Sequence, residues 1–159
     1  MESTSRRAVL RMLSNGLYIM TSRSADRVGA ATVTWVSQAS FRPPLIMAAL
    51  RRDGSLFGCL RESGVAALHV LGRAQQDVAR RFFAPTEAAD GLLNGEPVAP
   101  GLTAAPILGC APAYVECRVR QLIDAPGDHA VVLLEVIEAT CRERVAPLTI
   151  AESPWEYGG

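Results

Sequence analysis

Short hydroxyl side chains recur in a stretch of the chain that is nearly free of charge, AATVTWVSQASFRPPL at residues 30–45. The hydroxyl groups that alternate there with apolar or small residues belong to Thr32, Thr34, Ser37 and Ser40. A second segment, LRRDGS at residues 50–55, adds two arginines and a further serine. Hydroxyl groups, backbone N–H groups and arginines that converge from neighbouring strand ends suit a phosphate group or the polar edge of a ring. A strand that exposes threonines to solvent has the same pattern, so this alternative stays open.

Several other chemistries lack the residue patterns that they need. The sequence has no glycine-rich loop of the dinucleotide or Walker kind, so a bound phosphate would be held by the scattered set above. The chain has two histidines and no CxxC pair among its cysteines, which are Cys59, Cys110, Cys117 and Cys141. We therefore predict no metal site, and we interpret the cysteines as small buried thiols in a reducing compartment.

Composition restricts the partners and the location. The 16 basic residues balance the 16 acidic ones, whereas nucleic-acid-binding proteins usually carry a basic excess, so we expect no nucleic-acid partner. The longest apolar runs, such as AVVLLEVI at residues 130–137, are too short to cross a bilayer, so we expect no membrane association. The paired arginines of MESTSRRAVLRML resemble a twin-arginine signal, but Arg11 interrupts the apolar part. We expect an amphipathic N-terminal helix there and a cytoplasmic protein.

The elements that must position these residues are mostly strands. Residue patterns predict strands at 16–22, 28–36, 44–50, 65–71, 114–123 and 129–141, and helices at 55–63 and 73–83. The strand at 44–50 is continuously apolar and is expected to be covered on both faces. In the strand at 114–123, Val115, Cys117 and Val119 are expected on the face opposite Glu116, Arg118 and Arg120.

Residues 84–113 contain five prolines and are expected to lack lasting regular structure. Six short strands with few helices favour a single domain, residues 1–159, built as a mostly antiparallel barrel.

One long stretch of the chain carries a family resemblance. VGAATVTWVSQASFRPPLIMAALRRDGS is similar to the core motif of the flavin reductase-like family, whose members fold as an FMN-binding split barrel. ESGVAALHVLGRAQQDVARRFF, LNGEPV, APAYVECRV and GDHAVVLLEV extend the similarity, and PWEYGG resembles a tail found in one branch of the family. The resemblance covers nearly the whole chain. It implies a mostly β protein with short helices, a split β-barrel, that closes its open seam as a homodimer with the flavin near the interface.

The resemblance also assigns site residues by position. It places Thr32, Val33, Thr34 and Trp35 along the isoalloxazine ring, and it places Ser37, Gln38 and Ala39 nearer the ribityl chain and phosphate. Arg51, Arg52 and Ser55 would complete the phosphate site. Candidates to cover the ring are Phe82, Trp155 and Tyr157, and the segments 84–113 and SPWEYGG are candidate arms that cross to a partner subunit. His129 would position the nicotinamide, with a structural role in the turn after Asp128 as an equal alternative.

The activity implied by the resemblance is NAD(P)H-dependent reduction of a flavin, FMN or else FAD, with hydride passing from NADH or NADPH to flavin N5. The reduced flavin often serves a partner monooxygenase. A protein that holds FMN for electron transfer or ferric reduction, a flavin-binding module without turnover, and a haem-binding split barrel are the alternatives. Two departures from the family pattern stand out: His69, which we expect to be a packed residue, and Leu134, which would narrow the room beside the ring.

Overall fold

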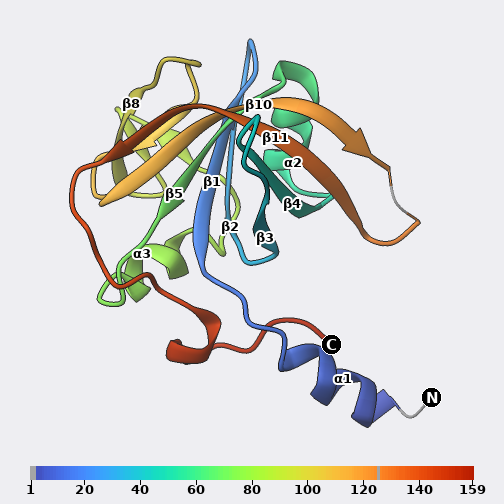
Figure 1. The fold of residues 1–159 in the computed structure, drawn as a ribbon. Helices are drawn as coiled ribbons and strands as arrows, with labels where there is room; N and C mark the ends of the chain where they lie inside the picture. Colours follow the sequence, from blue (N-terminus) through green and yellow to red (C-terminus); the bar gives the residue numbers. More distant parts are fainter. Residues whose placement is uncertain (1–2, 125) are drawn as a thin grey trace.

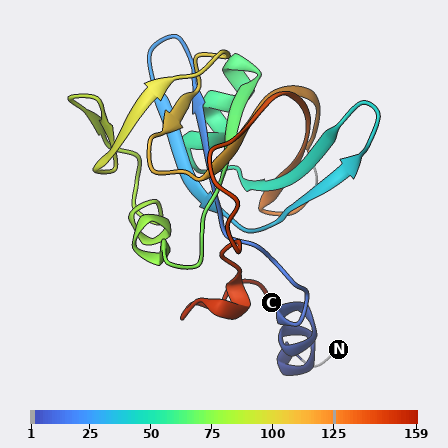
Figure 2. The same ribbon diagram turned by 60° about the vertical axis from the view of Figure 1, so that its left-hand side comes forward.

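The computed structural model describes residues 3–124 and 126–159. Seven strands form one antiparallel sheet in the order β2-β1-β5-β10-β11-β4-β3. Their bounds are β1 Tyr18–Arg23, β2 Val28–Val33, β3 Val36–Ser40, β4 Leu45–Arg51, β5 Val65–Val70, β10 Ala113–Ile123 and β11 His129–Cys141. Figures 1 and 2 show that the sheet curls on itself. The predicted mostly β, barrel-like fold is confirmed.

The hydroxyl-rich strip is divided between the two edges of this sheet, so the prediction of one strand at 28–36 was wrong. β2 ends at Val33 and pairs with β1, whereas β3 begins at Val36 and pairs with β4. Thr34 and Trp35 join the two edge strands, and the Ala49 N–H donates to the Trp35 carbonyl at 2.9 Å. Because the curled sheet brings its edges together, two residues are enough to connect them.

The segment from 84 to 113 contains a second small sheet, which corrects the expectation of irregular structure. Its strands are β6 Ala88–Ala89, β7 Leu92–Leu93, β8 Glu96–Pro100 and β9 Pro106–Leu108. The two turns are made by Asp90-Gly91 and Asn94-Gly95, and all four residues have positive φ. Such pairs favour two-residue hairpin turns, and this signal outweighs the nearby prolines because the strands are only two to five residues long.

The helices are short, and α1, α2 and α3 all form where helices were expected. α2, Ser55–Ser63, has the predicted bounds, with Gly54 as its N-cap and Gly64, at φ 70°, as its C-cap. α3, Gln76–Arg81, is shorter than the expected 73–83. α1, Ser3–Arg11, forms where the amphipathic helix was expected and buries none of its residues. A 3₁₀ turn, η1, spans Ile150–Glu152.

The structure corrects one expected strand face and adds a buried carboxylate to another. β4 is not covered on both faces, because Met47 is 45% exposed. In β10 the expected faces are confirmed, since Val115, Cys117 and Val119 pack in one core cluster, and Glu116 on the opposite face is buried because residues 102 and 103 donate hydrogen bonds to its carboxylate there. Burial disfavours the charged form of the Glu116 carboxylate, but hydrogen bonds from the Leu102 N–H and from the Thr103 N–H and hydroxyl hold its pKa below the ordinary value.

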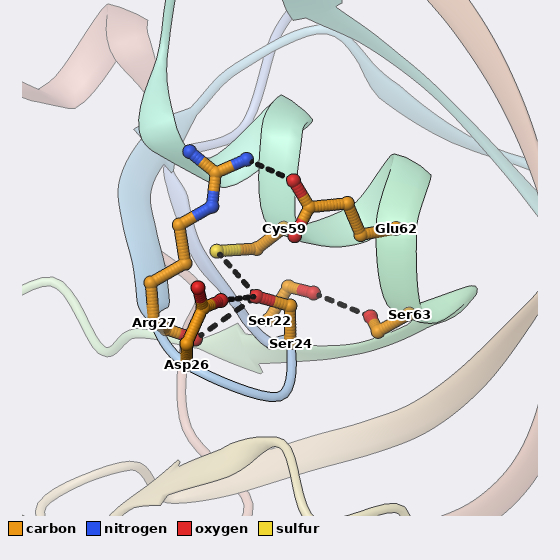
Figure 3. A network of polar contacts seen from close by, with 7 residues as sticks. All are labelled: Ser22, Ser24, Asp26, Arg27, Cys59, Glu62 and Ser63. Carbon is orange, nitrogen blue, oxygen red and sulfur yellow. Dashed lines mark hydrogen bonds and ion pairs between the residues drawn. The ribbon is translucent and has the colours of Figure 1, made fainter.

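A polar network holds α2 against the β1–β2 hairpin (Figure 3). Arg27 in the hairpin turn forms an ion pair with Glu62, and the Ser22 hydroxyl contacts the Ser63 hydroxyl at 3.2 Å. The guanidinium lies directly over Gly58, where an added Cβ would be 2.6 Å from Arg27 Nη2. These contacts fix the helix, whose first residues reach the pocket described below.

Gly29 allows α2 to approach β2 closely, and its replacement is a test of this packing. An added Cβ would lie 2.5 Å from the Ser55 carbonyl oxygen and 2.6 Å from the Leu56 backbone, so backbone would have to shift. We expect Gly29→Ala to lower the free energy of unfolding by roughly 1–3 kcal/mol. Gly127→Ala is the matched control, because an added Cβ there meets nothing within 4 Å. Melting curves that are equal for the two variants would contradict this role of Gly29.

Candidate functional site

A pocket of about 420 Å³ lies where β2, β4 and the start of α2 meet the C-terminal segment. The predicted site residues that line it are Thr32, Val33, Thr34, Trp35, Arg51, Phe82, His129, Trp155 and Tyr157. Residues 31–35 form one wall, and aromatic side chains from distant parts of the sequence form much of the rest. The structure therefore brings the first half of the hydroxyl strip, one arginine, the histidine and the candidate ring covers to one place.

One residue of the strip that lines this pocket has an unsatisfied hydroxyl group. Thr32 Oγ1 donates to the Ala79 carbonyl at 2.7 Å, so this hydroxyl serves the packing of α3. Thr34 is only 8% exposed, and within the described part of the chain its Oγ1 has no hydrogen-bond partner. A buried hydroxyl without a partner is costly, and native structures usually satisfy such a group with protein, water or ligand. Because Thr34 lines the pocket, its hydroxyl is the candidate of this strip for a hydrogen bond with a bound ligand.

Aromatic rings surround the mouth of the pocket. The Trp35 ring centroid lies 4.6 Å from the His129 ring centroid and 5.3 Å from that of Tyr157. Trp155 packs edge-on against Phe83 at 4.8 Å, and the Arg80 guanidinium lies 5.7 Å from the Trp155 ring centroid. Such rings offer flat apolar surfaces that suit a planar ligand, because offset stacking gains more than simple burial.

The hydrogen-bond roles of the two His129 ring nitrogens follow from their neighbours. Its Nδ1 lies 2.6 Å from Asp128 Oδ1, and this hydrogen bond holds the pKa of the Asp128 carboxyl below its ordinary value. An ionised carboxylate only accepts, so Nδ1 carries the proton and donates. In the neutral ring Nε2 is then an acceptor, and it lies 3.3 Å from the Tyr157 hydroxyl. Burial raises the pKa of Tyr157, so its hydroxyl keeps its proton and donates to Nε2. The side chain of His129 is 14% exposed, so Nε2 is held in a fixed direction at the pocket.

Arg51 lies at the edge of the pocket together with an acidic neighbour. Its Nε and Nη2 donate to the two carboxylate oxygens of Asp53 at 3.0 and 2.8 Å. This contact lowers the pKa of Asp53 and raises that of Arg51. Both side chains are about two-thirds exposed, so the pair is weak and the guanidinium can turn toward an anion.

Five of the sequence-predicted residues do not line the pocket. Ser37, Gln38 and Ala39 lie on the exposed edge strand β3, because the chain changes from one sheet edge to the other at Thr34 and Trp35. Arg52 forms an ion pair with Asp124 at 2.7 Å. The Ser55 hydroxyl lies 2.8 Å from that of Thr86. Their proposed contacts with the ribityl chain and phosphate stay predictions.

The sequence analysis missed several residues of the pocket wall, which are Leu17, Ala31, Ala49, Leu50, Asp53, Gly54, Leu56, Phe83, Ile150 and Glu156. Asp53 is visible in LRRDGS beside the two arginines, and Gly54 and Leu56 follow from the predicted helix start. Leu17 and Ile150 depend on pairing between residues 15–17 and 148–150, through Leu17 N–H to Leu148 O and Ile150 N–H to Asn15 O. No local sequence pattern predicts this pairing of residues 15–17 with residues 148–150.

The two departures from the family pattern lie outside this pocket lining. His69 is fully buried, and its Nε2 accepts from the Leu108 N–H while Nδ1 donates to the Ile19 carbonyl. Burial lowers its pKa to about 4, and the expected packing role is confirmed. Leu134 is buried in the core cluster between the sheet and α2.

Neither a metal cluster nor a membrane-spanning helix is found in the described part of the chain. Residues 3–124 and 126–159 contain no group of three or more His, Cys, Asp or Glu side chains suited to hold a metal ion. None of the helices within those ranges is long and apolar enough to cross a membrane.

Comparison with known proteins gives consistent relatives. The profile of the "Flavin reductase like domain" family matches residues 10–154. The chain is 35% identical over 118 residues to a putative diflavin flavoprotein A 3 of a Nostoc species, covering 74% of this chain but only 20% of that protein. It is 31% identical over 128 residues to an NADH:FMN oxidoreductase of Rhodococcus qingshengii, covering 80% of this chain and 65% of that protein. The chain thus spans less than two thirds of the length of these curated relatives.

A solved structure shares the architecture over nearly its whole length. BorF, the flavin reductase component of a bacterial two-component tryptophan halogenase, superimposes with a TM-score of 0.80 at 27% identity. The superposition covers 99% of this chain and 98% of BorF.

Proposed function

The chain belongs to the flavin reductase like family, and we propose that it is an NAD(P)H-dependent flavin reductase that binds FMN beside residues 31–35. The observation that carries the proposal is the pocket wall, in which residues 31–35, aromatic rings and Arg51 bound one space, and in which Thr34 has a buried hydroxyl without a partner. The names of the Rhodococcus oxidoreductase and of BorF support the same activity.

The residues of the pocket fit a flavin. A planar ring system with a polar edge needs flat apolar surfaces and a few placed donors, and the pocket supplies both. Residues 31–35 and Thr34 Oγ1 would meet the ring edge, and Arg51 would meet the phosphate. When bound, the flavin supplies the hydride acceptor. The chain's own part is to hold and cover the rings, with Phe82 and Trp155 as proposed covers, and to aim His129 Nε2 at the carboxamide of the nicotinamide.

The direct test is anaerobic mixing of the FMN-loaded protein with NADH and, separately, with NADPH. We expect the yellow colour of oxidised flavin to bleach, with a preference for one of the two donors. Binding of FMN without bleaching by either donor would contradict the reductase and favour a flavin-holding module.

A second candidate function, an FMN-holding electron-transfer protein, is favoured by one observation. The chain is similar to a fifth of a diflavin flavoprotein, so related domains are built into a larger flavoprotein. The same mixing experiment separates the candidates, because an electron-transfer module would take electrons from a protein donor and not from a nicotinamide nucleotide.

We also propose a homodimer, FAD as an alternative flavin, a partner oxygenase that consumes reduced flavin, and a cytoplasmic location. BorF serves a halogenase, which supports a partner of that broad type. α1 and the two residues after it leave Val9, Met12 and Leu13 more than 60% exposed, which supports a contact with a second copy. Light scattering on the FMN-loaded protein tests this, and a monomer with full FMN affinity would contradict a shared site.

A further inference from the structure

The two terminal segments meet beside the pocket. Arg11, the last residue of α1, forms an ion pair with Glu156 at 2.6 Å, and its Nε donates to the Gly158 carbonyl at 3.1 Å. Figures 1 and 2 both show the C-terminus ending beside α1, below the barrel. The family profile matches only residues 10–154, so residues 155–159 and most of α1 lie outside the matched domain. This contact therefore joins two segments that lie mostly outside the matched domain.

Within this tail, Trp155 is anchored and Tyr157 is held by weaker contacts. Trp155 packs against the cluster that contains Phe82 and Leu148, and it meets Phe83 edge-on. Tyr157 is 38% exposed and lies beside Trp35 and His129, with a hydrogen bond of 3.3 Å to His129 Nε2, at the long end for such a bond. The Arg11–Glu156 pair is 38% and 74% exposed, and exposed ion pairs stabilise little. Residues 156–159 are thus poised to move while Trp155 stays.

The place that Tyr157 fills is the place that the proposed reaction needs. Asp128 holds His129 so that Nε2 is its one remaining acceptor, and the Tyr157 hydroxyl occupies that acceptor. A pocket of about 420 Å³ is at the small end of the usual range of roughly 300–1,000 Å³, so it suits one nucleotide and not two. With FMN in the pocket, a nicotinamide ring can reach Trp35 and His129 only if Tyr157 leaves.

We propose that residues 156–159 are a displaceable plug, in which Tyr157 competes with the nicotinamide ring for the face of Trp35 and for His129 Nε2. Arg11 and α1 set how often the plug is closed. The proposal rests on the proposed function. A ligand that binds only the open state has its apparent affinity lowered by the open fraction, so the plug raises the apparent KM for NADH and leaves the chemical step unchanged.

Three variants test the plug through the split between KM and kcat. Tyr157→Phe removes one hydrogen bond and should lower the KM for NADH by roughly twofold to tenfold. Tyr157→Ala removes the ring as well and should lower it further. Arg11→Gln weakens the contacts of Arg11, which does not line the pocket, with Glu156 and Gly158. It should lower the KM for NADH with little change in kcat. Arg6→Gln, on the same helix, is the matched control and should leave KM unchanged. A KM that rises or stays the same in the Tyr157 variants would overturn the proposal.

Hydrogen–deuterium exchange gives a readout that does not depend on turnover. In the FMN-loaded protein, saturating NAD⁺ should increase amide exchange in residues 156–159 if the plug is displaced. Unchanged or slower exchange would overturn displacement, and slower exchange would mean that the tail closes over the ligand. If neither the wild type nor any variant reduces flavin with NADH, the proposed reductase function is contradicted. If NAD⁺ still increases amide exchange in residues 156–159 in that case, displacement of the plug is supported independently of the function.

Discussion

Replacement of Arg51 by alanine is expected to weaken FMN binding by about tenfold to a hundredfold. Hydrogen bonds to a charged group contribute roughly 1.5–3 kcal/mol, which corresponds to that range. Arg51 lines the pocket, and its weak exposed pair with Asp53 lets the guanidinium turn toward a phosphate. Riboflavin lacks the phosphate, so its affinity should be almost indifferent to the same substitution. Fluorescence titration with FMN and riboflavin measures both.

The neighbouring Arg52→Ala variant is the matched control. Arg52 carries the same charge one residue away, but it forms an ion pair with Asp124 and does not line the pocket. We expect Arg52→Ala to leave FMN affinity nearly unchanged. If Arg52→Ala is the variant that weakens FMN, the phosphate lies outside the pocket toward Asp124. If neither variant does, the phosphate is held by other groups.

The sequence predicted the pocket best where the signal is local. Residues 32–35 and Arg51 belong to one continuous motif, and α2 with its terminal Gly64 follows from residue preferences. The position of Ser37, Gln38 and Ala39 outside the pocket lining has a physical cause. Alternation along a strand shows which residues share a face, but it does not show where the chain leaves one sheet edge for another. That change at Thr34 depends on closure of the whole curled sheet.

Other features could not follow from local patterns at all. The burial of Glu116 depends on residues 102 and 103, which lie in the connection between β8 and β9 and donate hydrogen bonds to its carboxylate. The position of Tyr157 depends on the pairing of residues 148–150 with residues 15–17 and on Arg11. By contrast, the residue types of Asp90-Gly91 and Asn94-Gly95 do indicate hairpin turns, and this local signal is stronger than that of the prolines around them.

His129 combines a position that the sequence predicts with a chemistry that only the structure shows. The GDHA segment placed a histidine at the start of a strand, but its chemistry depends on a chain of hydrogen bonds. Asp128 fixes the proton on Nδ1, and Nε2 then faces the pocket as an acceptor. An acceptor held in a fixed direction can bind the amide N–H of the nicotinamide carboxamide. A purely structural role in the turn would use only the contact between Nδ1 and Asp128 and would leave Nε2 without a function.

His129→Ala should therefore slow reduction of bound FMN by NADH, by roughly tenfold to a few hundredfold in kcat/KM, while the protein stays yellow. The loss corresponds to one or two hydrogen bonds to the nicotinamide, and His129→Gln, which can still offer an acceptor, should recover part of it. Stopped-flow bleaching of the oxidised-flavin band measures the rate, and a melting curve of each variant measures the structural cost. If His129 only holds the turn after Asp128, the melting temperature falls by about a few degrees and the bleaching rate stays that of the wild type. A lower melting temperature together with a wild-type bleaching rate would contradict a role of His129 in nicotinamide binding. The two roles can be told apart because one changes the bleaching rate and the other changes the melting temperature.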